Sequence, residues 1–249
     1  MLKIFIIGYL LINTSLFAEN IQIAVAANVS YAIAPLTKEF NTLYPDTKVS
    51  IILGSSGKLT AQIKHGAPYQ LFMSANMKYP NSLYNDKIAI TKPRVYAKGS
   101  LAYFSTKKQD FTKGLKLTQS KTIKKIAVAN PKTAPYGIAT AEALKHAGLY
   151  EDIKNKFVYG ESISQTFVYS VKATDLGFVA KSLLYSPKMT QYKQGVHWED
   201  VDSKLYRPIS QGIVILKNGK NSAEVLAFYN FIFSVKAQKI LKDFGYLIP

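Results

Sequence analysis

Cysteine is absent from this chain of 249 residues. This absence excludes disulfide bonds, thiolate catalysis and metal sites built on cysteine. It also excludes a lipoprotein anchor, because that lipid is attached to a cysteine. The folded state must therefore be held by non-covalent packing. A hydrophobic fraction of 48% is enough for one large core or two moderate ones, and it argues against a disordered chain.

Histidine is scarce, with three residues at His65, His146 and His197. Each is isolated, and none has a carboxylate or a second histidine at ligand spacing, so the sequence offers no metal cluster and no evident general base. A serine hydrolase with Ser56 as nucleophile is the enzyme alternative, although Ser56 lacks the nucleophile-elbow pattern. We expect a protein that binds its ligand without turnover.

Acidic residues are few: 15 Asp and Glu stand against 32 Lys and Arg, a formal charge of +17. So basic a chain suggests nucleic acid, but the lysines are scattered and arginine occurs only at Arg94 and Arg207. We expect no nucleic-acid partner. A basic protein can instead draw small anions toward a cleft, and a merely solvated basic surface is the alternative.

Long apolar runs are also missing, apart from one near the start of the chain. Residues 1–18 carry Lys3, an apolar run over 4–12 and the small residue Ala18 before Glu19, as a signal peptide does. The run is too short to favour a membrane span, and no later segment is long enough. We therefore expect export to the periplasm.

The rest of the chain alternates short apolar strands with helical patterns, which is typical of an α/β fold. A first unit with the order β-α-β-α-β is followed by a second α/β unit, and apparent crossovers lie near Gly99 and Pro208. We expect two lobes. Residues 19–97 and 208–249 would form the first, and 98–207 the second.

The central stretch is Gly54 to Ile63, where a strand over 48–53 gives way to a helix. The first turn of a helix has unpaired N–H groups and a partial positive charge, and glycine lets a ligand approach the backbone closely. Gly57-Lys58 is followed by Leu59, so this is not a Walker loop. The alternatives here are an anion site and a plain helix N-cap.

Three further strand-to-helix junctions favour the anion site. They lie at Asn28, a candidate N-cap, at 130–137 and at 160–165. Pro35 predicts a kink in the helix after Asn28, or a helix that starts later. Ligands of open α/β sheets bind beyond the carboxyl ends of strands, so four such junctions indicate one cleft for a small anion. We expect no lysine or arginine at the ligand, and Lys58 to point away.

Several of these stretches together resemble the periplasmic molybdate-binding proteins of ABC importers, in the type II periplasmic-binding-protein superfamily. The resemblance covers nearly the whole mature chain and implies an α/β fold of two lobes. Each lobe would be a mostly parallel sheet flanked by helices, with the ligand cleft between the lobes. The matching stretches are Ala26–Asn28, Gly54–Ile63, Gly66–Pro68, Leu71–Ala75, Ala134–Gly137, Gly177–Ala180 and residues 237–246.

The resemblance also implies the residues that bind the oxyanion. Ser56 matches a serine that gives its hydroxyl and its backbone N–H, and Asn28 stands where many members have a second serine. Tyr136 and Ile163 match positions that donate backbone N–H groups. These four would hold molybdenum only as the bound oxyanion, molybdate or tungstate, with no cofactor. Ala180 stands where some members have a tyrosine donor.

The implied function is capture of molybdate and its delivery to an ABC permease with its ATPase, and we expect a monomer. Sulfate, phosphate, thiosulfate or an organic anion are alternative ligands. Gln70 replaces an aspartate common in the family, and we expect it to have a structural role.

Overall fold

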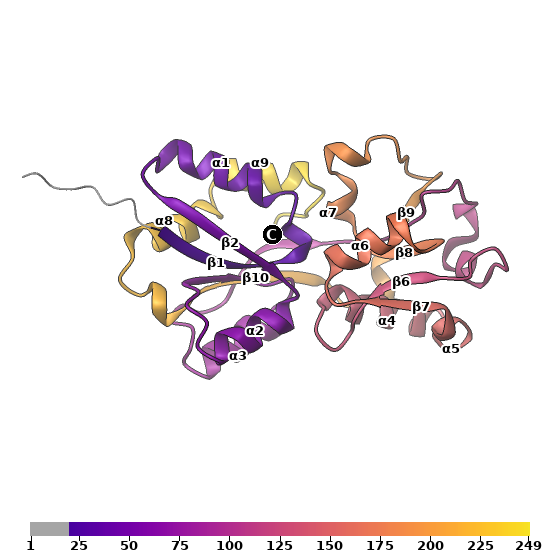
Figure 1. The fold of residues 1–249 in the computed structure, drawn as a ribbon, viewed down its shortest axis with the longest axis horizontal. Coiled ribbons are helices and arrows are strands. Elements are labelled where there is room, and N and C mark those ends of the chain that lie inside the picture. The colour runs from indigo at the N-terminus through magenta and orange to yellow at the C-terminus, as the bar shows by residue number, and fades with distance from the viewer. Residues whose placement is uncertain (1–19) are drawn as a thin grey trace, which may run out of the picture.

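A computed structural model describes residues 20–249, so the expected signal peptide over 1–18 lies outside the described residues. In Figure 1 two sheets lie side by side, each with its own helices. We call each sheet with its helices a lobe. Of the helices in residues 20–249, none is long and apolar enough to cross a membrane.

The first lobe contains a sheet with strand order β2-β1-β3-β10-β4. Its core strands are apolar on both faces because helices cover both faces, as a buried parallel strand requires. The strands are β1 (Asn20–Ala26), β2 (Lys48–Gly54), β3 (Leu71–Met73), β4 (Arg94–Gly99) and β10 (Ile209–Ile215), and the helices are α1 (Ile33–Leu43), α2 (Ser56–Lys64), α3 (Lys78–Asn85), α8 (Ala223–Phe231) and α9 (Val235–Asp243).

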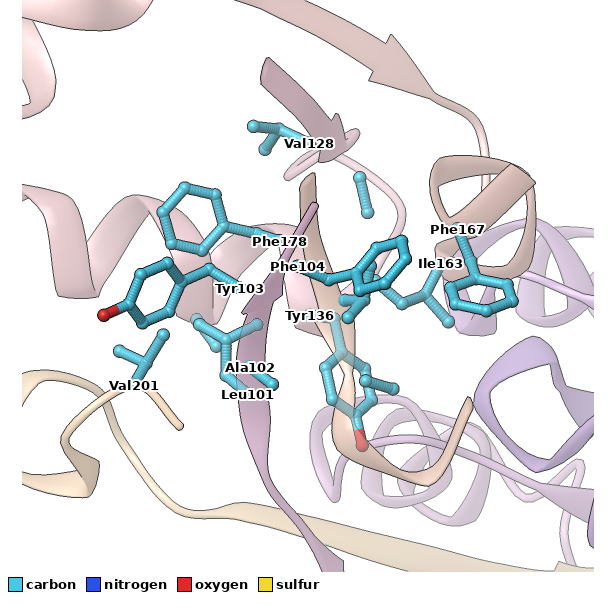
Figure 2. Packing of buried hydrophobic residues seen from close by; sticks show 14 of the residues in the cluster. Leu101, Ala102, Tyr103, Phe104, Val128, Tyr136, Ile163, Phe167, Phe178 and Val201 are labelled. Atoms are coloured by element: carbon cyan, nitrogen blue, oxygen red, sulfur yellow. The ribbon is translucent and has the colours of Figure 1, made fainter. Parts of the chain in front are cut away.

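The second lobe has the strand order β7-β6-β8-β5-β9. Aromatic and branched side chains of these strands pack against α4 and α6, and Figure 2 shows part of this core. The strands are β5 (Leu101–Phe104), β6 (Ile126–Ala129), β7 (Phe157–Gly160), β8 (Leu176–Ala180) and β9 (Trp198–Asp200), and the helices are α4 (Pro135–His146), α5 (Tyr150–Ile153), α6 (Ile163–Lys172) and α7 (Lys181–Leu184).

The two-lobed α/β architecture expected from the sequence is confirmed, but the sheets are mixed rather than mostly parallel. In each sheet of the described residues, two strand pairings are parallel and two are antiparallel. The antiparallel pairings come from the strands that pass between the lobes. β4 leaves the first sheet and β10 returns to it, so these two strands run in opposite directions.

The C-terminal helices complete the first lobe and not the second. Phe228 of α8 and Leu241 of α9 are fully buried in the core that contains Ile23 of β1 and Phe40 of α1. In Figure 1 the yellow C-terminal segment accordingly lies beside the indigo elements. The chain thus returns to the first lobe through β10, and its end packs on its beginning.

Several element ends differ from the sequence-based expectations. Asn28 is not the N-cap of a long helix: it lies inside a single 3-10 turn, η1 (Ala27–Val29), and α1 begins later, at Ile33. The later start places Pro35 in the first helical turn, where its missing N–H needs no partner. The helix expected after the junction over 130–137 begins within that stretch, with Pro135 as its first residue.

Candidate functional site

A small pocket lies between the lobes where the four strand-to-helix junctions meet. It leaves about 10 Å³ open to the centre of a water-sized sphere, which is about the room that one water molecule needs. All four sequence-predicted site residues line it. The lining residues are Ala26, Ala27, Asn28, Gly54, Ser55, Ser56, Ala75, Ala134, Pro135, Tyr136 and Ile163.

Ser56 is the first residue of α2 and is fully buried. Its Oγ accepts a hydrogen bond of 2.9 Å from the backbone N–H of Ala75. The hydroxyl hydrogen is therefore left for a second partner, and the backbone N–H of Ser56 belongs to the first turn of α2 and has no acceptor within the helix. Ser55 caps the helix instead, accepting from the N–H of Lys58 at 3.4 Å. Because Ser55 caps the helix, the hydroxyl and the backbone N–H of Ser56 can both donate hydrogen bonds to a ligand.

Tyr136 and Ile163 bring the N-termini of α4 and α6 to the pocket from the second lobe. Pro135 has no N–H, so Tyr136 carries the first N–H of α4. Ile163 is the first residue of α6, whose N-cap Ser162 accepts from the N–H of Gln165 at 3.2 Å. Both residues are buried, and their side chains belong to the core of the second lobe. Each residue therefore contributes its backbone N–H, at the N-terminus of a helix, to the pocket.

Asn28 closes the pocket on the first lobe and is 1% exposed. Its carboxamide Nδ2 lies 2.8 Å from Gln211 Oε1 and 2.8 Å from the Tyr246 hydroxyl. Its backbone carbonyl accepts from Tyr246 at 2.9 Å and from Ser182 at 3.0 Å. The last contact comes from the second lobe, so Asn28 sits at the junction of the two lobes.

Charged side chains are absent from the pocket lining of the described residues, although the chain has a formal charge of +17. Small apolar residues and helix N-termini surround the space instead. Neutral N–H and O–H donors in a water-excluded pocket can hold an anion, because the low dielectric strengthens each hydrogen bond. The arrangement can bind a small anion, and it offers no general base close to Ser56.

Lys58 points away from the pocket, as expected, and pairs with Glu161 of the second lobe. Its Nζ lies 2.7 Å from Glu161 Oε1, and both side chains are about half exposed, at 50% and 55%. Exposed ion pairs are worth roughly 0–1 kcal/mol because water and salt screen them. This bridge spans the mouth of the cleft without contacting the site.

Removing the bridge should have a small effect. We expect Lys58→Gln to weaken anion binding by no more than about fivefold at low salt, the equivalent of roughly 1 kcal/mol, with the difference vanishing in high salt. Calorimetric titration at two ionic strengths measures this. Glu161→Gln is the matched control, since it breaks the same pair from the other side. A loss far above fivefold for Lys58→Gln alone would mean that Lys58 contacts the ligand.

The lobes are in direct contact around the pocket, so the structure is a closed form. The N–H of Gly57 in α2 donates to the carbonyl of Thr133, in the loop before α4, at 2.9 Å. The Tyr79 hydroxyl donates to the same carbonyl at 3.4 Å. Together with the pair Lys58–Glu161, these bonds join the first lobe to the second on the side of the cleft mouth.

Behind the pocket, five buried side chains form what we call the hinge network: Asn28, Tyr96, Tyr136, Gln211 and Tyr246. The Tyr96 hydroxyl of β4 donates to Gln211 Oε1 of β10 at 2.8 Å, so the network ties the two crossover strands together. Burial raises the pKa of Tyr246 to about 12, and also raises the pKa of Tyr96 and of Tyr136. All three hydroxyls are therefore protonated at neutral pH.

Sequence reasoning missed most of the hinge network. Gln211 and Tyr246 lie 183 and 218 residues from Asn28 along the chain, and nothing in the sequence assigned either of them to the site. Crossovers were expected near Gly99 and Pro208, but nothing in the sequence connected them with the site. Only the fold brings these side chains together.

The remaining residues singled out from the sequence have structural places. Gln70 Oε1 accepts from the backbone N–H of Gln22 at 2.8 Å, in agreement with its expected structural role. Ala180 ends β8, is fully buried and offers no donor. His146 Nδ1 lies 2.7 Å from the Leu205 carbonyl, and His197 Nδ1 accepts from the N–H of Lys193 at 3.1 Å.

Comparisons with known proteins find a family model and relatives that match nearly all of the described residues. The family model described as bacterial extracellular solute-binding protein matches residues 21–247. The molybdate-binding protein ModA of Azotobacter vinelandii is 35% identical over 234 residues, covering 92% of this chain and 90% of that protein. The molybdate-binding protein ModA of Rhodobacter capsulatus is 32% identical over 236 residues, covering 92% and 89%. These relatives are binding proteins, which confirms the expectation of a protein without turnover.

Solved structures match the same architecture. The Azotobacter vinelandii periplasmic molybdate-binding protein superimposes with a TM-score of 0.85 at 31% identity, covering 92% of this chain and 99% of that one. The sulfate-binding protein SubI of Mycobacterium tuberculosis has a TM-score of 0.73, covering 92% and 86%, at 14% identity. The second likeness shows the fold alone.

Proposed function

Because the chain belongs to the family of bacterial extracellular solute-binding proteins, we propose that it captures molybdate outside the cytoplasm and delivers it to an ABC importer. The observation that carries the proposal is the convergence of helix N-termini from both lobes on one uncharged pocket. Tetrahedral oxyanions suit such a site because each of their oxygens accepts hydrogen bonds from fixed donors.

The proposed ligand set is Asn28, Ser56, Tyr136 and Ile163. Ser56 would give its hydroxyl and backbone N–H, and Tyr136 and Ile163 would give backbone N–H groups. The named molybdate-binding relatives support molybdate as the anion, and tungstate, which has the same charge and shape, should bind in the same way. Molybdenum would be present only within the anion, and we propose no cofactor.

Closure of the lobes on the anion would be the binding mechanism. Ser56 belongs to the first lobe and Tyr136 and Ile163 to the second, so an anion that bridges them gains all its contacts only in the closed form. Binding must therefore shift the population toward closure. The pocket has room for about one water molecule, so we expect slightly wider lobe separation around a bound oxyanion.

The lobes, location and partners follow from the same proposal. We propose residues 19–97 with 208–249 as the first lobe and 98–207 as the second, hinged at the crossovers between them. The periplasm would be the location, reached through a signal peptide over 1–18. The partners would be a permease with its ATPase, served by a monomer.

Calorimetric titration of the protein lacking residues 1–18 with molybdate, tungstate, sulfate and phosphate in turn tests the proposal. We expect tight binding of molybdate and tungstate and weaker binding of sulfate and phosphate. Selectivity should follow from pocket size, because molybdate and sulfate share their charge and tetrahedral shape. If the protein binds sulfate or phosphate tightly and does not bind molybdate, the proposed ligand is wrong. If it binds no oxyanion, the pocket is not an oxyanion site.

A further inference from the structure

The last residues of the chain leave α9 and turn back to the junction of the two lobes, where Figure 1 places the C-terminus. Gly245 has a φ of 75°, the left-handed conformation that glycine adopts without strain and that commonly ends a helix. The N–H of Leu247 then donates to the Lys98 carbonyl at 2.9 Å, and the N–H of Lys98 donates to the Leu247 carbonyl at 2.7 Å. Tyr246 is thereby held beside the end of β4, where the chain leaves the first lobe. We call residues 245–247 the C-terminal strap.

The buried Tyr246 hydroxyl makes two hydrogen bonds with Asn28. It donates its hydrogen to the Asn28 backbone carbonyl at 2.9 Å, and the hydrogen is present at neutral pH because burial raises the pKa of Tyr246 to about 12. A hydroxyl has only one hydrogen, so the Asn28 side-chain atom 2.8 Å from it must be a donor, which is Nδ2. The two bonds together therefore fix the orientation of the Asn28 carboxamide.

The Asn28 side chain has no donor left for a ligand in this orientation. Its two Nδ2 hydrogens go to Gln211 Oε1 and to the Tyr246 hydroxyl, each at 2.8 Å. Its Oδ1 has no hydrogen-bond partner among residues 20–249, but an oxygen without hydrogen cannot donate to an anion. The donor that remains is the backbone N–H. It lies at the start of the 3-10 turn η1, where an N–H has no acceptor inside the turn.

Building on the proposed function, we propose that Tyr246 is a positioning residue that holds Asn28 so that its backbone N–H, and not its carboxamide, donates to the oxyanion. Tyr246 is not among the residues that line the pocket, so it acts through Asn28. The carboxamide of Asn28 serves as an anchor to the C-terminal strap and to Gln211. Because the strap also pairs with Lys98, it connects the pocket to the strand that passes between the lobes.

Removing the Tyr246 hydroxyl should weaken molybdate binding, although residue 246 does not contact the ligand. Phenylalanine keeps the ring and loses both bonds to Asn28, so we expect Tyr246→Phe to lower molybdate affinity about five- to a hundredfold. Tyr206→Phe is the matched control, because the buried Tyr206 hydroxyl accepts from the backbone N–H of Leu101 at 3.0 Å and makes no bond to Asn28. Both variants should melt at lower temperature, but only Tyr246→Phe should lose affinity. Equal affinities of the two variants in calorimetric titration would overturn the proposal.

Amide NMR of the wild-type protein tests the same proposal and needs no variant to fold. In the ligand-free protein we expect nuclear Overhauser effects between the Asn28 NH₂ hydrogens and the Tyr246 ring. On addition of molybdate, the backbone N–H signal of Asn28 should move further than its NH₂ signals. A larger movement of the NH₂ signals would overturn the proposal, as would the absence of the ligand-free effects. Those effects are measured without any anion, so this inference and the proposed function fail separately.

Discussion

Replacing Ser56 by alanine is expected to weaken molybdate binding about ten- to over a hundredfold. The Ser56 hydroxyl is fully buried, and its Oγ already accepts from the N–H of Ala75 at 2.9 Å, which directs its own hydrogen elsewhere. A hydrogen bond to a charged ligand is worth roughly 1.5–3 kcal/mol, which gives the stated range. Calorimetric titration measures the change. The affinity for sulfate should fall by a similar factor, because both anions would use the same hydroxyl. The order of the two affinities should therefore not change.

The same substitution should also destabilise the ligand-free protein. Alanine leaves the buried N–H of Ala75 without an acceptor, which costs roughly 1–3 kcal/mol of unfolding free energy. Ser170→Ala is the control for loss of a buried hydroxyl away from the pocket, since Ser170 Oγ donates to the Phe167 carbonyl within α6. The control should bind molybdate like the wild type. If Ser56→Ala binds as tightly as this control, the Ser56 hydroxyl does not bind the anion.

Adding a side chain at Gly57 should weaken molybdate binding because it destabilises the closed form. Residue 57 itself would not contact the anion. A Cβ atom here would lie 2.9 Å from the Thr133 carbonyl oxygen and 2.8 Å from the Tyr79 hydroxyl. Tyr79 can rotate away, but Thr133 is backbone of the other lobe and can move only if the cleft opens. Overpacking costs roughly 1–3 kcal/mol, so we expect Gly57→Ala to lower molybdate affinity about five- to over a hundredfold.

The direction of the stability change separates this effect from misfolding. Gly57 lies in the first turn of α2, where alanine is a better helix former than glycine, so the ligand-free melting temperature should stay unchanged or rise. Gly57→Val should weaken binding further, because a larger side chain holds the lobes further apart. Solution scattering should show a larger radius of gyration for Gly57→Val with molybdate than for the wild type. Wild-type affinity in Gly57→Val would contradict the closure mechanism.

The sequence could predict the architecture because local patterns carry it. Apolar strands such as 126–129 and 176–180 are short and continuous, so the alternation of strands and helices can be recognised from the sequence. The helix start at Pro135 was missed because a proline suggests a turn, yet it is also the residue best suited to the first helical position. The three-residue strand β9 was missed because it is too short to show a period.

The pocket itself was predictable only in part. Ser56 and Ile163 follow strands within their own segments, and a local junction points to each of them. The role of Asn28 was not accessible in this way, because its side-chain partners lie on β10 and near the C-terminus. Residues 57 and 133 likewise meet only once both lobes have folded and closed. Contacts across the cleft are a property of the tertiary structure, so no local pattern encodes them.

The contrast between a strongly basic chain and an uncharged pocket has a kinetic consequence. Surface lysines act on the anion at long range and in a salt-dependent way, so they influence how often an anion arrives. Under the proposed mechanism, the neutral donors would act only after closure, where salt does not reach, so they would set how long the anion stays. Arrival rate and residence time are thereby assigned to different parts of the molecule. Surface charge can then change without altering which anion the pocket prefers.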